Sequence, residues 1–299
     1  MMRYLPQLLL ILTTLFWAGN FVVARAMHLA LPPLSLSFWR WLLALIILLP
    51  WVAPKLLAER ALLFKHWKIL LLLAVLGVVN FNTFIYLGLQ YTTATNATLL
   101  QSVVPSVVML LAVLLLGQTI SKLQLAGLAL SLLGVLCIVL RGDLTQLLNV
   151  QINRGDLWVL AAMLSWALYT VALNWRPVAL SKSALLGSTV LVGTLVLLPV
   201  YLWELGQGQR IALVADNLLV LGYVAIFPSV LAYFFWNYGV EKLGAPSAGL
   251  FVYLMPVFGM ILSMLFLNEQ PALFHLFGFV LVLAGMLLAT RRRPVPKQV

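Results

Sequence analysis

The chain consists of two copies of one pattern, displaced by about 150 positions. When residues 86–141 are moved forward by 151 positions they fall on 237–292, and the glycines and prolines that punctuate the pattern coincide. Further upstream, an offset of 149 brings two tryptophans together. Both halves must therefore adopt the same local arrangement, which constrains the fold more than any single motif does. The matched pairs are Gly88 and Gly239, Pro105 and Pro256, Gln118 and Glu269, Gly127 and Gly278, Gly134 and Gly285, and Trp17 and Trp166.

The composition places these copies in a membrane. The chain is 64% hydrophobic and 8% charged, and a soluble protein of 299 residues has too few charged side chains at that ratio to cover its apolar surface. Residues 68–89, 95–116 and 245–267 form nearly uncharged runs that are long enough to cross the hydrocarbon layer of a bilayer. We therefore expect an all-α polytopic membrane protein.

Each copy contains five apolar segments, and an odd number of spans inserts the second copy upside down relative to the first. The prediction is ten transmembrane helices arranged as two inverted five-helix repeats. The repeats occupy 1–141 and 154–290, joined by an external loop at 142–153 and followed by a basic cytoplasmic tail at 291–299. The helices are expected at 5–28, 34–53, 67–91, 95–117, 122–140, 154–176, 182–203, 216–240, 245–267 and 272–290, and the only long connections at 54–66 and 141–153.

The distribution of charge gives an orientation and excludes one class of partner. The net charge is +11, but the basic residues lie in short connections beside apolar spans, which favours contact with lipid headgroups and not with nucleic acid. With the N-terminus in the cytoplasm, 13 of the 18 basic residues lie on the inner side. We therefore expect both termini to be cytoplasmic. The other five basic residues are Arg25, Arg40, Arg141, Arg154 and Arg210.

Polar and aromatic side chains recur on one face of six of the predicted helices. Polar groups within spans are costly unless they face protein or water, so this matched set predicts the lining of a central cavity. Polar packing between helices is the alternative interpretation for any one of these residues. The predicted substrate-binding residues are Trp17, Asn20, Asn82, Tyr86, Ser102, Trp166, Tyr169, Tyr233, Asn237 and Tyr253.

Proline and glycine mark two further features of the repeat. Pro105 and Pro256 interrupt helices at equivalent depths, where the loss of a backbone hydrogen bond permits either a moving hinge or a static kink. The fifth and tenth spans carry glycines seven residues apart and almost no polar groups. Such faces allow close helix approach and predict a scaffold or a dimer surface, so that the protein is a monomer or a weak homodimer.

Other polar residues are expected at the membrane surface. Arg40 lies between two tryptophans near the outer end of the second span, where we expect it to extend toward the headgroups. His28, His66 and His275 lie near span ends and are expected to be interfacial. The sequon at Asn96 opens a span too close to the bilayer to favour glycosylation.

Motifs for catalysis, metals and cofactors are missing from the sequence. It contains no G-x-x-x-x-G-K-[ST], H-E-x-x-H or G-x-S-x-G pattern, and all seven acidic residues lie near span ends or in loops. We therefore expect no enzymatic activity, no metal and no cofactor. The lack of a deep carboxylate also argues against a proton relay and against a strongly cationic substrate.

Several short motifs resemble those of the EamA-type drug/metabolite transporters. They are W-A-x-N-F at 17–21, F-W-R-W-L-L-A at 38–44, the repeated prolines, and Glu269-Gln270-Pro271 before a final G-x(6)-G span. The resemblance covers nearly the whole chain, although Gln118 stands where the family pattern has glutamate. It implies a ten-helix secondary transporter of the bacterial inner membrane. The aromatic content most resembles that of the YddG-like exporters of aromatic amino acids.

These observations predict a secondary transporter that exports small neutral or zwitterionic metabolites by alternating access, with aromatic or neutral amino acids as the favoured substrates. Aromatic faces stack on rings and attract ammonium groups, while amides and hydroxyls satisfy polar groups without net charge. Two alternatives remain open. The first is transport of a neutral drug or a nucleotide-sugar, and the second is an intramembrane lipid-modifying enzyme.

Overall fold

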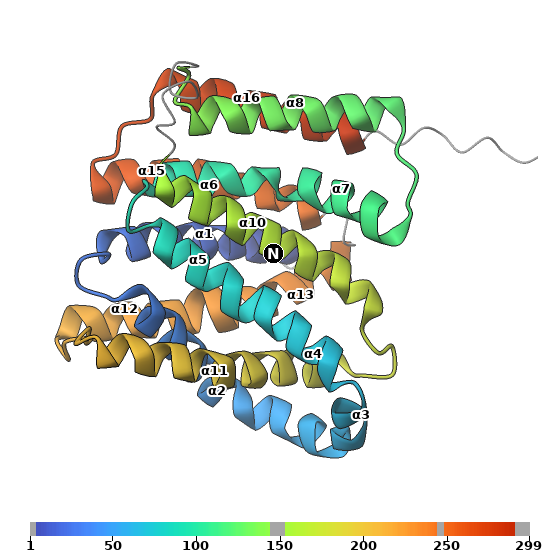
Figure 1. The fold of residues 1–299 in the computed structure, drawn as a ribbon, viewed down its shortest axis with the longest axis vertical. Coiled ribbons are helices and arrows are strands. Elements are labelled where there is room, and N and C mark those ends of the chain that lie inside the picture. Colours follow the sequence, from blue (N-terminus) through green and yellow to red (C-terminus); the bar gives the residue numbers. More distant parts are fainter. Residues whose placement is uncertain (1–3, 144–152, 244–247, 291–299) are drawn as a thin grey trace, which may run out of the picture.

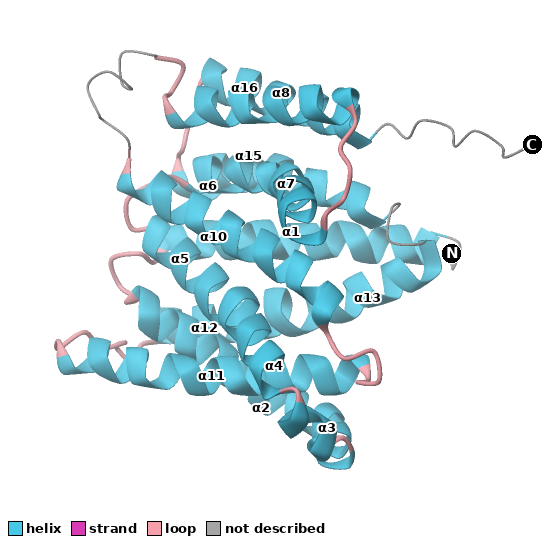
Figure 2. Cartoon of the chain, turned by 45° about the vertical axis from the view of Figure 1, so that its right-hand side comes forward, coloured by secondary structure: helices cyan, strands magenta, loops and turns pink. Residues whose placement is uncertain are grey.

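The computed structural model describes residues 4–143, 153–243 and 248–290, and every regular element in this part of the chain is helical. Figures 1 and 2 show the helices lying side by side across the long axis of the molecule. The first half contains α1 (Leu5–Ala26), α2 (Pro33–Ala58), α3 (Arg60–Lys65), α4 (Trp67–Ala74), α5 (Phe81–Gly88), α6 (Ala94–Leu100), α7 (Val104–Leu116) and α8 (Lys122–Val139). The second half contains α10 (Arg154–Ala172), α11 (Lys182–Gly206), α12 (Ala215–Ile226), α13 (Ala232–Leu243), α15 (Leu254–Leu267) and α16 (Leu273–Thr290).

Helices occupy the positions of the predicted spans, but two of them are shorter than a full span and one predicted connection is helical. Eight helical segments are long and apolar enough to cross a membrane, and two more, at Phe251–Leu267 and Leu273–Leu288, are apolar but shorter in the described part of the chain. The expected connection at 54–66 is wrong, because α2 continues to Ala58 and α3 occupies most of the remainder. Leucine and alanine dominate this stretch and favour helix over loop.

The first helix of each half packs against helices of the other half. The first helix of the first half, α1, packs against α13 and α15 of the second half, and α10, the first helix of the second half, packs against α5 and α7. At one end of the long axis α8 lies beside α16, and toward the other end α2 lies beside α11 (Figure 1). The centre of the molecule is therefore an interface between the halves.

Two matched breaks interrupt the third span of each half. A π-helical segment covers Val75–Asn80 between α4 and α5, and a second covers Phe227–Leu231 between α12 and α13. A π turn releases backbone carbonyls from the α-helical pattern. The hydroxyl of Ser165 in α10 donates to the carbonyl of Leu76 over 2.9 Å, and the indole of Trp17 in α1 donates to the carbonyl of Pro228 over 3.2 Å. In each π-helical segment, one backbone carbonyl therefore accepts a hydrogen bond from a side chain of the opposite half.

The predicted prolines follow a second pair of matched breaks. A 3-10 segment at Gln101–Val103 precedes α7, and another at Leu250–Tyr253 precedes α15. Pro105 and Pro256 are then near the start of the next α-helix, where the missing amide hydrogen removes little bonding. The fourth and ninth predicted spans are therefore each composed of two helical pieces in the described residues.

Reciprocal carboxylate caps join α2 and α11, which run antiparallel. Glu204 at the end of α11 accepts hydrogen bonds from the amides of Leu34 and Ser35 at the start of α2, over 3.1 and 2.6 Å. Glu59, just after α2, accepts one from the amide of Ser181 before α11 over 2.9 Å. This hydrogen bond from the backbone lowers the pKa of the Glu59 carboxyl below its ordinary value. Anionic caps at helix N-termini stabilise both ends of the pair.

The glycine faces of α8 and α16 contact each other. A Cβ added at Gly134 would lie 2.6 Å from the carbonyl oxygen of Gly278, and one at Gly285 would collide with the carbonyl oxygen of Gly127. Only glycine allows the backbones to approach so closely. The chain covers the glycine face with its own second copy, so this face does not form a dimer, and the scaffold interpretation agrees with this packing. Whether these spans form a weak dimer through another face stays a prediction.

Candidate functional site

A cavity of about 870 Å³ lies between the two halves of the molecule. Residues of α1, α2, α5 and α7 line it from the first half, and residues of α10, α13, α15 and α16 from the second. Its side chains are a mixture of aromatic, aliphatic and uncharged polar groups with one arginine. The lining residues are Trp17, Asn20, Phe21, Arg40, Phe81, Asn82, Gln101, Ser102, Val104, Pro105, Val108, Trp166, Thr170, Tyr233, Trp236, Gly249, Val252, Tyr253, Met255, Pro256 and Met286.

Most of the residues predicted from the sequence to bind substrate lie on this cavity. The two halves contribute them from equivalent helices, as the repeat pattern implies. Their role in binding stays a prediction, since the structure reports their position alone. The predicted residues on the lining are Trp17, Asn20, Asn82, Ser102, Trp166, Tyr233 and Tyr253, together with the predicted hinges Pro105 and Pro256.

The other three predicted residues lie off the lining. Tyr86 is fully buried behind it and donates a hydrogen bond to Asn20 over 2.9 Å. Tyr169 packs against Trp166, with ring centroids 5.1 Å apart. Asn237 is exposed on α13. A helical repeat predicts that equivalent positions share a face, but it does not predict which face a neighbouring helix covers.

Two pairs of aromatic rings lie at the cavity. Trp17 of α1 lies 5.5 Å from Trp236 of α13, and Trp166 of α10 lies 4.7 Å from Phe81 of α5, measured between ring centroids. The rings of each pair are tilted by 44° and 42°. Each pair therefore joins the first helix of one half to the third span of the other, and presents flat apolar faces that suit a ring or an alkyl chain.

Arg40 occupies the cavity wall, and the prediction that it extends to the membrane surface is wrong. Its side chain is 4% exposed. Nε donates to the hydroxyl of Ser229 over 2.6 Å, and Nη1 donates to Asn82 Oδ1 over 2.7 Å and to Asn20 Oδ1 over 3.2 Å. Nη1 also donates to the hydroxyl of Tyr86 over 2.8 Å. The neighbouring tryptophans resembled a membrane belt in the sequence, but these neutral acceptors from both halves hold the guanidinium inside.

A separate polar cluster joins α6, α10 and α16 outside the cavity. Asn96 donates to the carboxylate of Asp156 over 3.4 Å. Nδ1 of His275 accepts from the amide of Ala272 over 2.8 Å, so the proton lies on Nε2, which donates to Oδ1 of Asn96 over 2.8 Å. His275 is therefore buried against protein at the start of α16, and its depth at the membrane interface stays a prediction. The burial of Asn96 agrees with the argument against glycosylation. This cluster ties three helices together near their ends.

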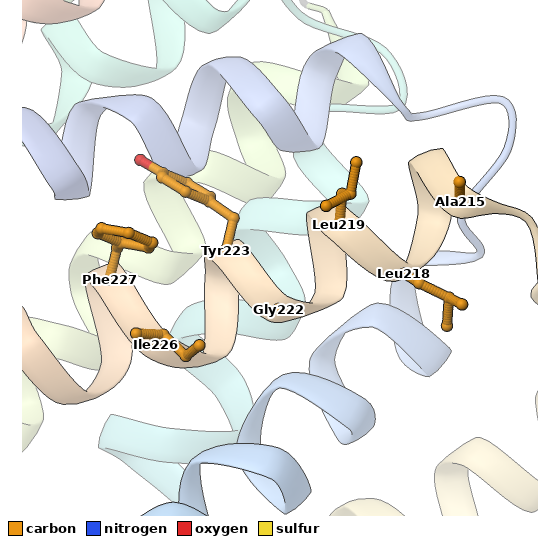
Figure 3. A pocket seen from close by; sticks show the side chains of 7 residues that line it. All are labelled: Ala215, Leu218, Leu219, Gly222, Tyr223, Ile226 and Phe227. Atoms are coloured by element: carbon orange, nitrogen blue, oxygen red, sulfur yellow. The ribbon is translucent and has the colours of Figure 1, made fainter.

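A second pocket, of about 680 Å³, lies along α12 and the start of the π-helical segment after it. Figure 3 shows its side chains arranged along one helix, with the hydroxyl of Tyr223 directed toward a neighbouring helix. That hydroxyl donates to the carbonyl of Phe16 over 3.2 Å, so the one polar group of the lining is already satisfied. The remaining lining is apolar, which suits lipid contact better than selective binding. It consists of Ala215, Leu218, Leu219, Gly222, Ile226 and Phe227.

The helical bundle and its shared cavity are those of a membrane transporter, and comparison with known proteins identifies the family. The EamA-like transporter family matches residues 5–140 and again 153–291. The chain belongs to this family. A crystal structure that is 19% identical in sequence has the same fold, with a TM-score of 0.62 over 95% of this chain and 96% of its own.

Relatives over nearly the full length are also transporters by name. An uncharacterized transporter of Archaeoglobus fulgidus is 33% identical, over 96% of this chain and 98% of its own. The uncharacterized transporter YyaM of Bacillus subtilis is 28% identical, over 95% and 93%. A probable terminal-alkyne amino-acid exporter of Streptantibioticus cattleyicolor is 26% identical, over 95% and 92%.

Proposed function

We propose that the chain is a secondary transporter that exports small neutral or zwitterionic metabolites by alternating access, with aromatic or neutral amino acids as its substrates. Ten membrane spans form two inverted repeats of five in this proposal. The protein lies in the bacterial inner membrane with both termini in the cytoplasm, as the excess of basic residues on the inner side favours. Within the family it belongs with the YddG-like exporters.

One observation carries this proposal: the cavity lies between the halves and both contribute equivalent side chains to it. Inverted repeats that share a central site can exchange conformations, so that the site opens first to one side and then to the other. Matched breaks in the third and fourth spans supply places where each half can bend. A cavity built by one half alone would lack this property.

The size and chemistry of the cavity suit an amino acid. Its volume of 870 Å³ exceeds that of an aromatic amino acid and leaves room for water. The tryptophan pairs provide apolar faces, and the side chains of Asn20, Asn82 and Ser102 provide donors and acceptors. The name of the amino-acid exporter among the relatives points to the same class of substrate.

Exchange in liposomes tests the proposal. Liposomes that contain the purified protein and unlabelled phenylalanine should take up labelled phenylalanine faster than protein-free liposomes do. Because none of the described residues that line the cavity is acidic, an imposed pH gradient should change this exchange little. Absence of exchange with phenylalanine, tryptophan and leucine would contradict the substrate class, and uphill movement driven by a pH gradient would contradict the uncoupled mechanism.

A further inference from the structure

Arg40 is the only charged residue on the cavity lining in the described part of the chain. The lining contains no aspartate, glutamate, lysine or histidine, and no carboxylate of the described residues forms an ion pair with Arg40. A guanidinium keeps its proton at any physiological pH. The cavity therefore carries one fixed positive charge that the described residues do not neutralise.

A buried cation without a counter-ion is costly, and neutral acceptors offset that cost only in part. The four partners of Arg40 are an alcohol, a phenol and two amides, none of which carries a negative charge. Its second terminal nitrogen, Nη2, makes no hydrogen bond to any described residue. The geometry thus holds the guanidinium by Nε and Nη1 and leaves one nitrogen available.

We infer that Arg40 binds the carboxylate of the substrate, so that the transported molecules carry one carboxylate and an apolar or aromatic body. A guanidinium forms stronger hydrogen bonds with a carboxylate than with neutral acceptors. The tryptophan pairs then receive the rest of the molecule. This inference rests on the proposed transport function and names the group that selects its substrates.

Amines that lack a carboxylate are rejected by the same charge. A cation in the cavity would meet the guanidinium without an intervening carboxylate, and like charges at short range in a medium of low polarity repel strongly. A zwitterionic amino acid and a simple organic acid both satisfy Arg40. Only the amino acid has an ammonium group, which can gain contacts with the aromatic faces.

A single isosteric change neutralises the cavity while keeping Arg40 in place. Asn20 accepts hydrogen bonds from Arg40 and Tyr86 through Oδ1, and its Nδ2 makes no hydrogen bond to a described residue. Asn20→Asp therefore preserves each of these hydrogen bonds and adds one negative charge beside the guanidinium. Arg40→Gln removes the positive charge by a different route. Asn268→Asp, at an exposed helix end, adds the same charge away from the cavity.

The experiment measures binding to the purified full-length protein by the quenching of tryptophan fluorescence. Its probes are L-phenylalanine, 3-phenylpropionate and L-phenylalaninamide. The wild-type protein and Asn268→Asp should bind the two carboxylates more tightly than the amide, by a factor on the order of ten. Asn20→Asp should weaken carboxylate binding by a similar factor and remove the preference, and Arg40→Gln should do the same.

Equal binding of phenylalanine and its amide to the wild-type protein would overturn the inference. A carboxylate preference that survives in Asn20→Asp would also overturn it, even if Arg40→Gln does not fold. Tighter binding of phenylalanine than of phenylpropionate supports amino acids, and the reverse supports simple organic acids. Exchange of labelled phenylalanine in liposomes is measured in parallel. If the protein exchanges phenylalanine but shows no preference for carboxylates in binding, the proposed transport function is supported and the proposed role of Arg40 is wrong.

Discussion

At the scale of single residues, Trp17 and Trp166 are the strongest candidates for substrate contact. Each lies on the cavity and faces another aromatic ring of the opposite half. We expect Trp17→Ala and Trp166→Ala each to weaken phenylalanine binding by about 1 kcal/mol, or about fivefold, through loss of stacking. Export from cells should fall with it. Titration of the purified variants checks the affinity.

The matched control is Trp203→Ala, because Trp203 is an exposed tryptophan on α11 and lies off the cavity. It should export and bind as the wild-type protein does at equal expression. If both cavity variants bind phenylalanine as the wild-type protein does, these tryptophans pack within the protein and do not contact the substrate. A loss in all three variants would indicate a general effect on folding.

The sequence predicted the positions of Trp17 and Trp166 well, because a tryptophan that recurs among polar neighbours in both repeats is typical of a site that the repeats share. It misplaced Arg40, because a cationic side chain between two tryptophans has the same local pattern at a membrane surface as inside a bundle. The difference lies in Asn82 and Ser229, which are distant in sequence and surround the guanidinium only after the halves assemble. Asn237 was predicted because the repeat matches it to Tyr86. The two residues have different surroundings, since Tyr86 is buried and Asn237 is exposed.

At the scale of helices, Pro105 and Pro256 lie in the first turn of the α-helix that follows each 3-10 segment. We expect the double variant Pro105→Ala and Pro256→Ala to slow phenylalanine exchange more than it weakens phenylalanine binding. The proline ring disfavours a continuous α-helix because it clashes with the carbonyl four residues before it, whereas alanine allows a continuous helix that opposes bending. Rates from liposomes and affinities from titration separate the two effects.

Pro199→Ala is the control for this pair, since Pro199 lies inside α11 and does not line the cavity. Its exchange rate should stay close to that of the wild-type protein. An unchanged exchange rate in the double variant would reduce Pro105 and Pro256 to static kinks.

The close contact of α8 with α16 depends on glycine. Gly134→Ala places a methyl group against the backbone of Gly278, and such overpacking should lower the free energy of unfolding by about 1–3 kcal/mol. Gly222→Ala provides the control, because no atom lies within 4 Å of a Cβ at that position. Thermal unfolding in detergent compares the two, and equal midpoints would show that the contact tolerates a side chain.

The sequence predicted most spans because uncharged runs of bilayer length are typical of membrane-spanning helices. It did not predict the π-helical segments, since Gly77 and Pro228 at matched positions are compatible with a simple kink. The hydrogen bonds of these segments to α10 and α1 decide the backbone path, and these contacts form only between the halves. For the same reason, the glycines of α8 and α16 did not by themselves reveal that these two helices pair.

At the scale of the whole molecule, the distribution of basic residues predicts the orientation. Residues 144–152 of the predicted external loop at 142–153 lie outside the described residues, and we expect the loop to face the outside of the cell. A single cysteine in that loop, on a Cys137→Ser background, should react with an impermeant thiol reagent in intact cells. Reaction only after lysis would reverse the orientation.

The central claim is that one cavity, shared by both halves, receives substrate from each side of the membrane in turn. The most direct measurement is the labelling of Ser102→Cys, again on a Cys137→Ser background, by an impermeant thiol reagent in intact cells and in inverted vesicles. Ser102 lines the cavity, and cysteine differs from serine by one atom. We predict labelling from both sides, with phenylalanine slowing it in both preparations. Labelling from one side only, or labelling that phenylalanine does not slow, would contradict the account.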